Sequence, residues 1–155
     1  MSTGLMREKV QRQVSQLSTF LATTYVLYVK TQNFHWNVTG PRFFTLHELF
    51  EKQYLELAEA VDEIAERIRA LKGVAPGTMH EFLQLSEIKE SKEQLSENQM
   101  LNTLAEDNED IANMLAEWIP KAQEDGDEGT ADIYIQRLKL HEKNAWMLRS
   151  HISKE

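Results

Sequence analysis

Apolar side chains recur every three or four positions along four long stretches of the chain, and clusters of glycine and proline separate these stretches. The breaks lie at Gly40–Pro41, between residues 73 and 77, and between residues 120 and 129. Because helix interiors exclude proline and penalise glycine, the uninterrupted stretches predict four long helices. These stretches are 5–39, 42–72, 78–119 and 130–155.

Each stretch carries one apolar stripe at the helical period. In the second stretch, Phe50, Leu57 and Ile64 follow one another at intervals of seven residues and therefore share a face. A helix with one apolar face has to bury that face against other helices. Alternation with period two is not sustained anywhere, so no sheet is expected. The pattern predicts an all-α fold, an antiparallel four-helix bundle.

The connection between the second and third helices, residues 73–96, is too long for a plain turn. Thr78, a residue type favoured at helix N-caps, precedes a group of apolar residues. These are Met79, Phe82, Leu83 and Leu85. We expect a short extra helix near 78–85, in a connection that crosses the bundle from one end to the other.

The composition narrows the class of protein. The chain has 155 residues and no cysteine, which suits one domain over residues 1–155 without disulfides, a thiolate nucleophile or a cysteine-ligated metal. No uncharged apolar run approaches the roughly 20 residues that span a bilayer, and the first residues lack the apolar segment of a secretory signal. We therefore expect a cytoplasmic protein without a membrane partner.

The charge is strongly acidic and unevenly spread. The formal net charge is −8, and residues 87–128 hold thirteen acidic side chains against three lysines. Most of this acidic segment is interpreted as a solvated face. An acidic balance of this size argues against a globally basic nucleic-acid binder.

Without cysteine, the candidate metal ligands are histidine, aspartate and glutamate, a mixture that suits iron, manganese or zinc. Four-helix bundles often hold a di-iron site through two Glu-x-x-His motifs. No histidine of this chain has a glutamate three residues before it; the residues there are Gln32, Phe44, Gly77, Leu138 and Leu148. A di-iron site of that kind inside one bundle is therefore not expected.

Two of the five histidines lie in apolar stripes close to candidate carboxylates. His35 continues the stripe of the first helix and His47 that of the second. Taken alone, His35 or His47 would be interpreted as a hydrogen-bonded core histidine. We give this interpretation to His141. Glu51 lies one helical turn after His47, which makes it a further candidate ligand.

Asp62 and Glu66 are four residues apart on the second helix and so share a face. They flank the apolar stripe, where a carboxylate needs a partner or a metal. The alternative is that Glu66 pairs with Arg67 or Arg69 and that Asp62 is merely exposed, and the residues alone leave both interpretations open.

Helix length constrains how these ligands could meet. His47 and Asp62 are 15 residues apart, about 22 Å at 1.5 Å per residue, so they cannot bind one ion within a single chain. If both bind metal, a second copy must lie antiparallel and bring its Asp62 and Glu66 to His35 and His47 of the first. A two-fold axis does this and creates two equivalent sites. Metal ligation therefore predicts a homodimer at least.

Several segments of this chain strongly resemble the Dps family of mini-ferritins. They carry the patterns FHWNV, LHxxFE and DxxAER, and the helix layout and the segment Glu142–Leu148 extend the resemblance along the chain. The patterns fall within residues 30–40, 46–51 and 62–68.

The resemblance implies a ferritin-like bundle assembled as a hollow dodecamer with tetrahedral symmetry. It implies ferroxidase centres between two-fold-related subunits, each holding two irons. By position, His35 and His47 come from one subunit, with Asp62 and Glu66 from its neighbour. Glu66 would bridge the two irons, and Glu51 would help to hold the more weakly bound one. The chain departs from the family pattern at Glu51, where we expect Asp in many members.

The resemblance also implies the reaction, in which Fe(II) is oxidised, preferably by hydrogen peroxide, and ferric oxide is stored in the cavity. Two irons can deliver two electrons to peroxide together, which avoids release of hydroxyl radical. Iron would enter through three-fold pores near the start of the last helix, where carboxylates would concentrate Fe(II). The candidates are Asp125, Asp127, Glu128 and Asp132. Each is alternatively a helix N-terminal carboxylate favoured by the helix dipole.

The alternative function is a DNA-coating or structural cage with little ferroxidase activity. Family members that coat DNA often use tails rich in lysine and arginine, but this chain has Arg7 and Lys9 before its first stripe and Lys154 after its last. Twelve copies would carry twelve times −8, or −96, so direct DNA binding at physiological salt is not expected. Retention of all four ligands, two histidines and two carboxylates, favours the enzyme.

Overall fold

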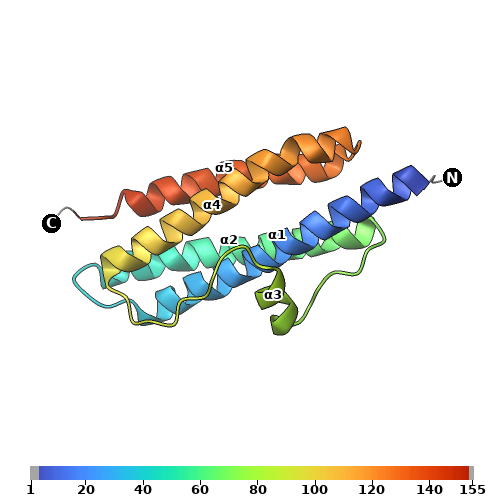
Figure 1. Ribbon diagram of the computed structural model, residues 1–155. Coiled ribbons are helices and arrows are strands. Elements are labelled where there is room, and N and C mark those ends of the chain that lie inside the picture. Colours follow the sequence, from blue (N-terminus) through green and yellow to red (C-terminus); the bar gives the residue numbers. More distant parts are fainter. Residues whose placement is uncertain (1–3, 154–155) are drawn as a thin grey trace.

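Four long helices lie side by side in the computed structural model, which describes residues 4–153 (Figure 1). Residues 4–153 contain no strand, so the predicted all-α bundle with one short extra helix is confirmed. Lys154, considered above for DNA contact, lies outside the described residues. The helices are α1 (Gly4–Asn37), α2 (Phe43–Ala70), α3 (Met79–Leu85), α4 (Glu97–Glu124) and α5 (Glu128–Arg149).

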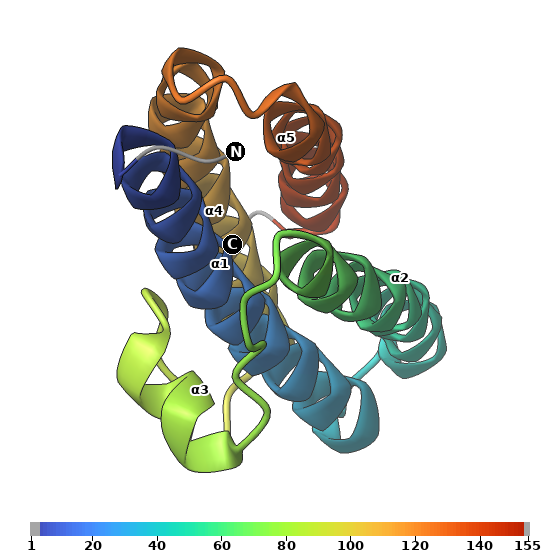
Figure 2. The ribbon, with the colours of Figure 1, turned by 90° about the vertical axis from the view of Figure 1, so that its right-hand side faces the viewer.

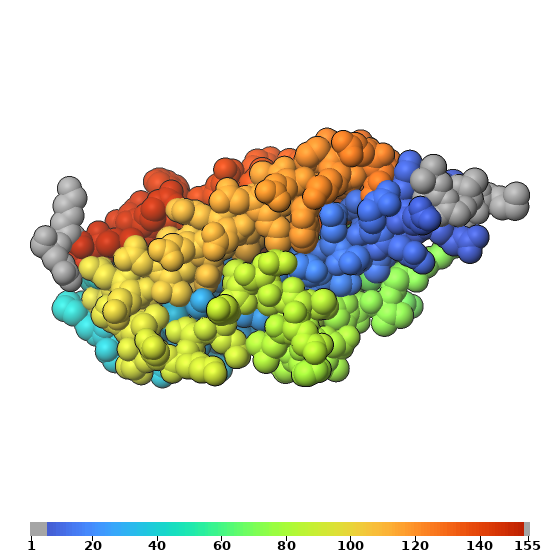
Figure 3. Space-filling view, in the orientation of Figure 1, coloured from blue at the N-terminus to red at the C-terminus, as the bar shows by residue number. Residues whose placement is uncertain are grey.

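The bundle consists of two helical hairpins. α1 packs along α2, and α4 packs along α5; Figure 2 shows the four helices at the corners of the bundle, with α3 beside α1. The connection from α2 to α4 runs from one end of the bundle to the other (Figure 1). In Figure 3 this connection lies over part of α1. Its length and crossing agree with the sequence prediction.

The short helix α3 begins where the sequence predicts. The Thr78 hydroxyl accepts a hydrogen bond from the Glu81 backbone N–H at 3.2 Å, which confirms Thr78 as the N-cap. Phe82 is buried and stacks on Tyr25 with ring centroids 4.3 Å apart. The other apolar residues of α3 stay exposed, namely Met79, Leu83 and Leu85. One aromatic side chain therefore anchors α3 to α1.

The predicted apolar stripes form the core. Phe50, Leu57 and Ile64 of α2 are each at most 2% exposed, and burying a side chain of this size contributes about 1.5–3 kcal/mol. They pack against buried residues of the other long helices, among them Leu17, Phe20, Leu101, Leu104, Tyr134 and Leu148. None of the helices in the described part of the chain combines the length and the apolar character needed to cross a membrane.

The expected break at Pro120 is wrong, because α4 continues past it to Glu124. Proline cannot donate to the carbonyl of Ala116, one turn earlier. Both residues are exposed, so water can satisfy that carbonyl and the helix does not have to end there. α4 also begins earlier than its apolar stripe, at a capping box formed by Ser96 and Gln99.

Gly129, expected in a loop, lies in the first turn of α5. Asp127 caps this helix by accepting a hydrogen bond from the Thr130 backbone N–H at 3.0 Å. A Cβ at Gly129 would come within 2.8 Å of an Arg67 guanidinium nitrogen. Glycine at this position therefore permits the close approach of α2 to the start of α5.

Candidate metal centre

His35 and His47 face each other near the turn between α1 and α2. Their rings are stacked, with centroids 3.9 Å apart and planes 15° from parallel. Each Nδ1 lies 2.7 Å from the backbone carbonyl oxygen of the other residue. Because a carbonyl oxygen only accepts hydrogen bonds, each Nδ1 carries a proton and donates it. Nε2 is therefore the nitrogen of each ring whose lone pair can bind a metal.

The turn that aligns the two histidines is held against the start of α4. The Arg42 backbone N–H donates to the Glu97 carboxylate at 2.9 Å, and its guanidinium donates to the Asn98 side-chain oxygen at 2.9 Å. Gly40 has φ +125°, and a Cβ there would lie 2.7 Å from the Glu97 carboxylate. The tight turn thus depends on glycine, and its attachment to α4 fixes where the histidine pair sits.

Aromatic rings enclose the histidine pair. Phe43 stacks on His47 with centroids 5.0 Å apart, and the Tyr54 ring lies 5.2 Å from that of His35. Neither residue is predicted from the sequence as part of the site, although Tyr54 follows His47 by seven positions and so shares its face of α2. Trp36, which follows His35 in the sequence, is 64% exposed in the single chain.

The carboxylate candidates lie elsewhere on α2. Glu51 is half-buried one turn from His47, whereas Asp62 and Glu66 are exposed. Since α2 is one unbroken helix, Asp62 is about 22 Å along it from His47. The residues described contain no group of three or more potential metal ligands within one chain. A single chain therefore brings the two histidines together but does not join them to Asp62 and Glu66.

The alternative pairing of Glu66 with a neighbouring arginine is not observed. Arg67 instead forms an ion pair with Asp127 at 2.6 Å, and Arg69 donates to a backbone carbonyl at 2.8 Å. Within residues 4–153 neither Asp62 nor Glu66 forms an ion pair or a hydrogen bond through its carboxylate. Both carboxylates are thus available to a ligand or a partner.

The bundle interior contains the core histidine that the sequence indicates. His141 is fully buried; its Nδ1 donates to the Asn108 side-chain oxygen at 2.8 Å, and its Nε2 accepts from Arg137 at 3.2 Å. Burial lowers the pKa of His141 well below its usual value, so the ring is neutral. Arg137 also pairs with Glu56. A guanidinium in this position disfavours a cation in the centre of the bundle.

The candidate pore residues divide into two groups. Asp125 accepts from Arg12 at 2.7 Å, and this guanidinium lowers the pKa of the Asp125 carboxyl. Asp127 caps α5 and forms an ion pair with Arg67 of α2. Glu128 and Asp132 are exposed. The structure thus places all four near the α4–α5 turn, with two already neutralised by arginines of the same chain.

Comparison with known proteins agrees with this architecture. Residues 14–155 match the ferritin family, described as a ferritin-like domain, so the class is that of ferritin-like bundles. Within this class the chain belongs to the Dps family. It is 40% identical to DNA protection during starvation protein 2 of Bacillus anthracis over 140 residues, 90% of this chain and 96% of that protein.

Solved structures point to the same family. The crystal structure of Dps from Staphylococcus aureus superposes with a TM-score of 0.90 at 39% identity, covering 94% of this chain and 97% of that one. A Dps protein from Vibrio cholerae O1 gives a TM-score of 0.90 at 29% identity, covering 94% and 92% respectively. It is described as a member of a broad superfamily of ferritin-like diiron-carboxylate proteins.

Proposed function

We propose that this protein oxidises Fe(II) at sites shared by two-fold-related subunits and stores the ferric product inside a dodecameric cage. His35 and His47 of one subunit and Asp62 and Glu66 of its neighbour would hold the iron. The observation that carries the proposal is the stacked histidine pair, in which each Nδ1 is bonded to a backbone carbonyl and each Nε2 is left without a hydrogen-bond partner among residues 4–153. Its complement is a pair of unpartnered carboxylates at the far end of the same helix.

The donor set fits iron. Imidazole nitrogens together with carboxylate oxygens suit Fe(II), and the chain has no thiolate to favour a softer metal. Because Nδ1 of each histidine donates to a carbonyl, Nε2 is the nitrogen that would bind the metal. Glu51, one turn from His47, would add a carboxylate for a second iron. The ferritin-like diiron-carboxylate description of the Vibrio cholerae relative supports two irons per site.

Hydrogen peroxide is the oxidant that best matches a paired site. Each Fe(II) gives up one electron, and peroxide takes both electrons and two protons to become two water molecules. No hydroxyl radical is released when both electrons arrive together. This chemistry would protect a cell, and its DNA, from iron-dependent oxidative damage, and we assign it to the cytoplasm.

The DNA-coating alternative receives less support. Arg12, one of the few cations near the start of the chain, is paired with Asp125. Each subunit carries −8, and affinity for DNA depends on cations that neutralise phosphates. We therefore place the protective role in the removal of iron and peroxide rather than in tight DNA binding at physiological salt.

The proposal is tested by mixing two inactive variants. One variant carries His35→Ala with His47→Ala, and the other carries Asp62→Ala with Glu66→Ala. Each alone is expected to assemble but to lose fast peroxide-driven oxidation of anaerobically loaded Fe(II), followed by absorbance. In a mixed two-fold pair, one site regains all four ligands and the other has none. Verified co-assemblies are therefore expected to recover part of the oxidation rate.

Two matched controls accompany this experiment. His80→Ala and Glu63→Ala each remove an exposed side chain of the same type, and both are expected to keep the full oxidation rate. Mixed assemblies that stay inactive would contradict the intersubunit site, because a site shared by the two variants would hold all four ligands and should restore oxidation. A stable monomer in light scattering at micromolar concentration would contradict the cage.

A further inference from the structure

A row of aromatic rings leads away from the histidine pair along the contact between α1 and α2. Its successive centroid distances are 5.2 Å from His35 to Tyr54, 5.8 Å from Tyr54 to Tyr28, and 5.7 Å from Tyr28 to Tyr25. Phe82 closes the row, 4.3 Å from Tyr25. Each step lies within or just below the 4.5–7 Å range of interacting aromatic pairs. The rings form a continuous path of contacts.

This row contains three of the four tyrosines of the chain. All three are half-buried, and the Tyr28 hydroxyl accepts a hydrogen bond from the Gln32 amide at 3.4 Å. A phenol is protonated at neutral pH, so a tyrosine that loses an electron also releases its proton and becomes a neutral radical. The row is therefore a series of oxidisable groups. Its first tyrosine, Tyr54, lies next to the ring of the candidate iron ligand His35.

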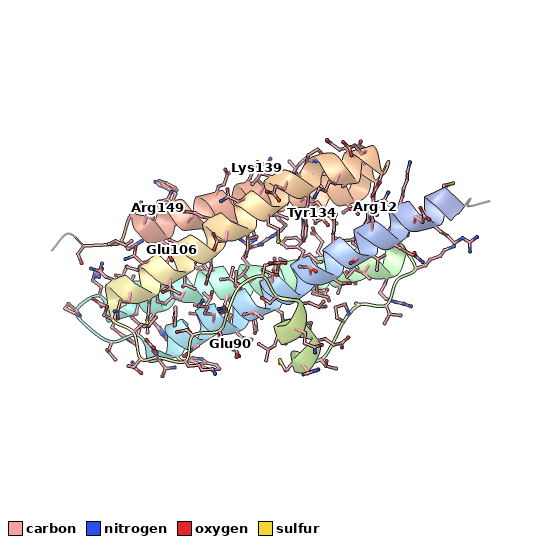
Figure 4. All side chains as sticks on the ribbon, in the orientation of Figure 1. Arg12, Glu90, Glu106, Tyr134, Lys139 and Arg149 are labelled. Atoms are coloured by element: carbon pink, nitrogen blue, oxygen red, sulfur yellow. The ribbon has the colours of Figure 1, made fainter. Side chains whose placement is uncertain are left out.

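The fourth tyrosine is separate from this row. Tyr134 is fully buried between the α4–α5 pair and α1 (Figure 4). Its ring contacts Phe20 and Trp118, with centroids 5.7 and 6.0 Å away. Tyr134 has the same side chain as the three tyrosines of the row, but its ring does not contact theirs. Tyr134 thus provides a matched control within the chain.

We propose that Tyr54, Tyr28 and Tyr25 form an electron relay that completes the reduction of peroxide when a site holds one iron instead of two. The proposal rests on the proposed ferroxidase function. Peroxide needs two electrons, and a single Fe(II) supplies one as it becomes Fe(III). Tyr54 supplies the second electron and releases its phenolic proton to solvent, while peroxide takes up two protons and leaves as two water molecules.

The oxidising equivalent then moves along the row. Tyr28 gives an electron and a proton to the Tyr54 radical, and Tyr25 does the same for Tyr28. Phe82 has no hydroxyl and stops the transfer. Tyr25 and Phe82, together with Met79, line a pocket of about 210 Å³ between α1 and α3. There an enediol reductant of the ascorbate class would give one electron and one proton to the Tyr25 radical and return it to the phenol. The relay therefore carries one oxidising equivalent away from the iron site. Without the relay, this equivalent would be released as hydroxyl radical.

The experiment loads the assembled protein anaerobically with one Fe(II) per histidine pair and adds hydrogen peroxide. Rapid-freeze EPR detects tyrosyl radicals, a spin trap in solution detects hydroxyl radical, and absorbance follows iron oxidation. The wild type is expected to give a tyrosyl signal. Tyr54→Phe is expected to lose this signal and to release more trapped hydroxyl radical, whereas Tyr134→Phe is expected to keep the wild-type signal. Tyr28→Phe is expected to hold the radical on Tyr54, with a changed hyperfine pattern.

These outcomes distinguish a failure of the relay from a failure of the proposed ferroxidase function. If the wild type oxidises iron without any tyrosyl signal, the relay is overturned and the ferroxidase stands. A signal that survives Tyr54→Phe unchanged, or disappears in Tyr134→Phe, overturns the proposed path. If two irons per site are not oxidised by peroxide in the wild type, the proposed function fails and the relay fails with it.

Discussion

The histidine pair at the α1–α2 turn and His141 in the bundle interior use the same side chain in opposite ways. At the turn, each ring makes one hydrogen bond, through Nδ1 to a backbone carbonyl, and Nε2 keeps its lone pair. In the interior both nitrogens of His141 are engaged, one by Asn108 and the other by Arg137. The pair can accept a metal, whereas His141 has no nitrogen left to offer.

This difference shows that burial alone does not identify a ligand. His35 is 7% exposed and His141 is fully buried, and both lie on apolar stripes. What separates them is the chemistry of the nearest partner. A carbonyl oxygen satisfies one nitrogen and fixes the tautomer, while an amide oxygen and a guanidinium together satisfy both nitrogens.

The strongest test of this comparison removes one member of the pair. His47→Ala deletes a proposed iron ligand and is expected to slow peroxide-driven oxidation by about two orders of magnitude or more, since even outer-shell changes cost 10–100-fold in metal affinity or activity. Because His47 is half-buried, loss of its hydrogen bond to the His35 carbonyl is expected to cost only about 1 kcal/mol of stability. Absorbance kinetics and thermal unfolding measure the two effects, with His80→Ala as the control.

The reciprocal change is expected to reverse this result. His141→Ala leaves a cavity and removes a partner from Asn108 and from Arg137, which is expected to cost about 3 kcal/mol. For a chain of this size the melting temperature falls by about 6–12 °C, compared at equal subunit concentration because assembly also stabilises. The iron oxidation rate at a temperature where both proteins are folded is expected to remain near the wild-type value. A lost rate in an intact cage would place His141 in the iron chemistry.

The smallest effect concerns the pH dependence of stability. Burial lowers the folded-state pKa of His141 well below 6.5, so below pH 6.5 the unfolded chain takes up a proton that the folded chain refuses. The stability contribution is therefore complete above pH 6.5 and is lost as the pH falls, by up to about 1.4 kcal/mol per pH unit. In iron-free protein, His141→Gln is expected to flatten this loss in denaturant titrations at several pH values. Parallel curves for the two proteins would contradict a neutral buried His141.

The fold could be predicted largely from the apolar stripes, because the burial of Phe50, Leu57 and Ile64 depends only on their spacing along one helix. The prediction failed at Pro120, where the helix continues. Proline in a helix interior deprives the carbonyl one turn earlier, here that of Ala116, of its hydrogen bond. Whether water can replace this bond depends on how α4 packs in the bundle, which the local sequence does not reveal.

The candidate site could be predicted only in part. The stripe placed His35 and His47 at the core, but their reciprocal hydrogen bonds depend on the register of α1 against α2, which the turn at Gly40 sets. The partner of Asp125 is Arg12, 113 positions away in sequence, and no local pattern indicates such a contact. The joining of Asp62 and Glu66 to the histidines stays a prediction, since it requires a second copy.

The unbroken course of α2 has a consequence for when the protein becomes active. Under the proposed function, a newly made subunit carries half of one site near each end of this helix and a complete site at neither. Iron oxidation then begins only when subunits meet, so in dilute solution the onset of activity follows the square of subunit concentration. Under this function, a cell that makes little of the protein would hold inactive chains, and a cell that makes it in quantity would start iron oxidation through assembly alone.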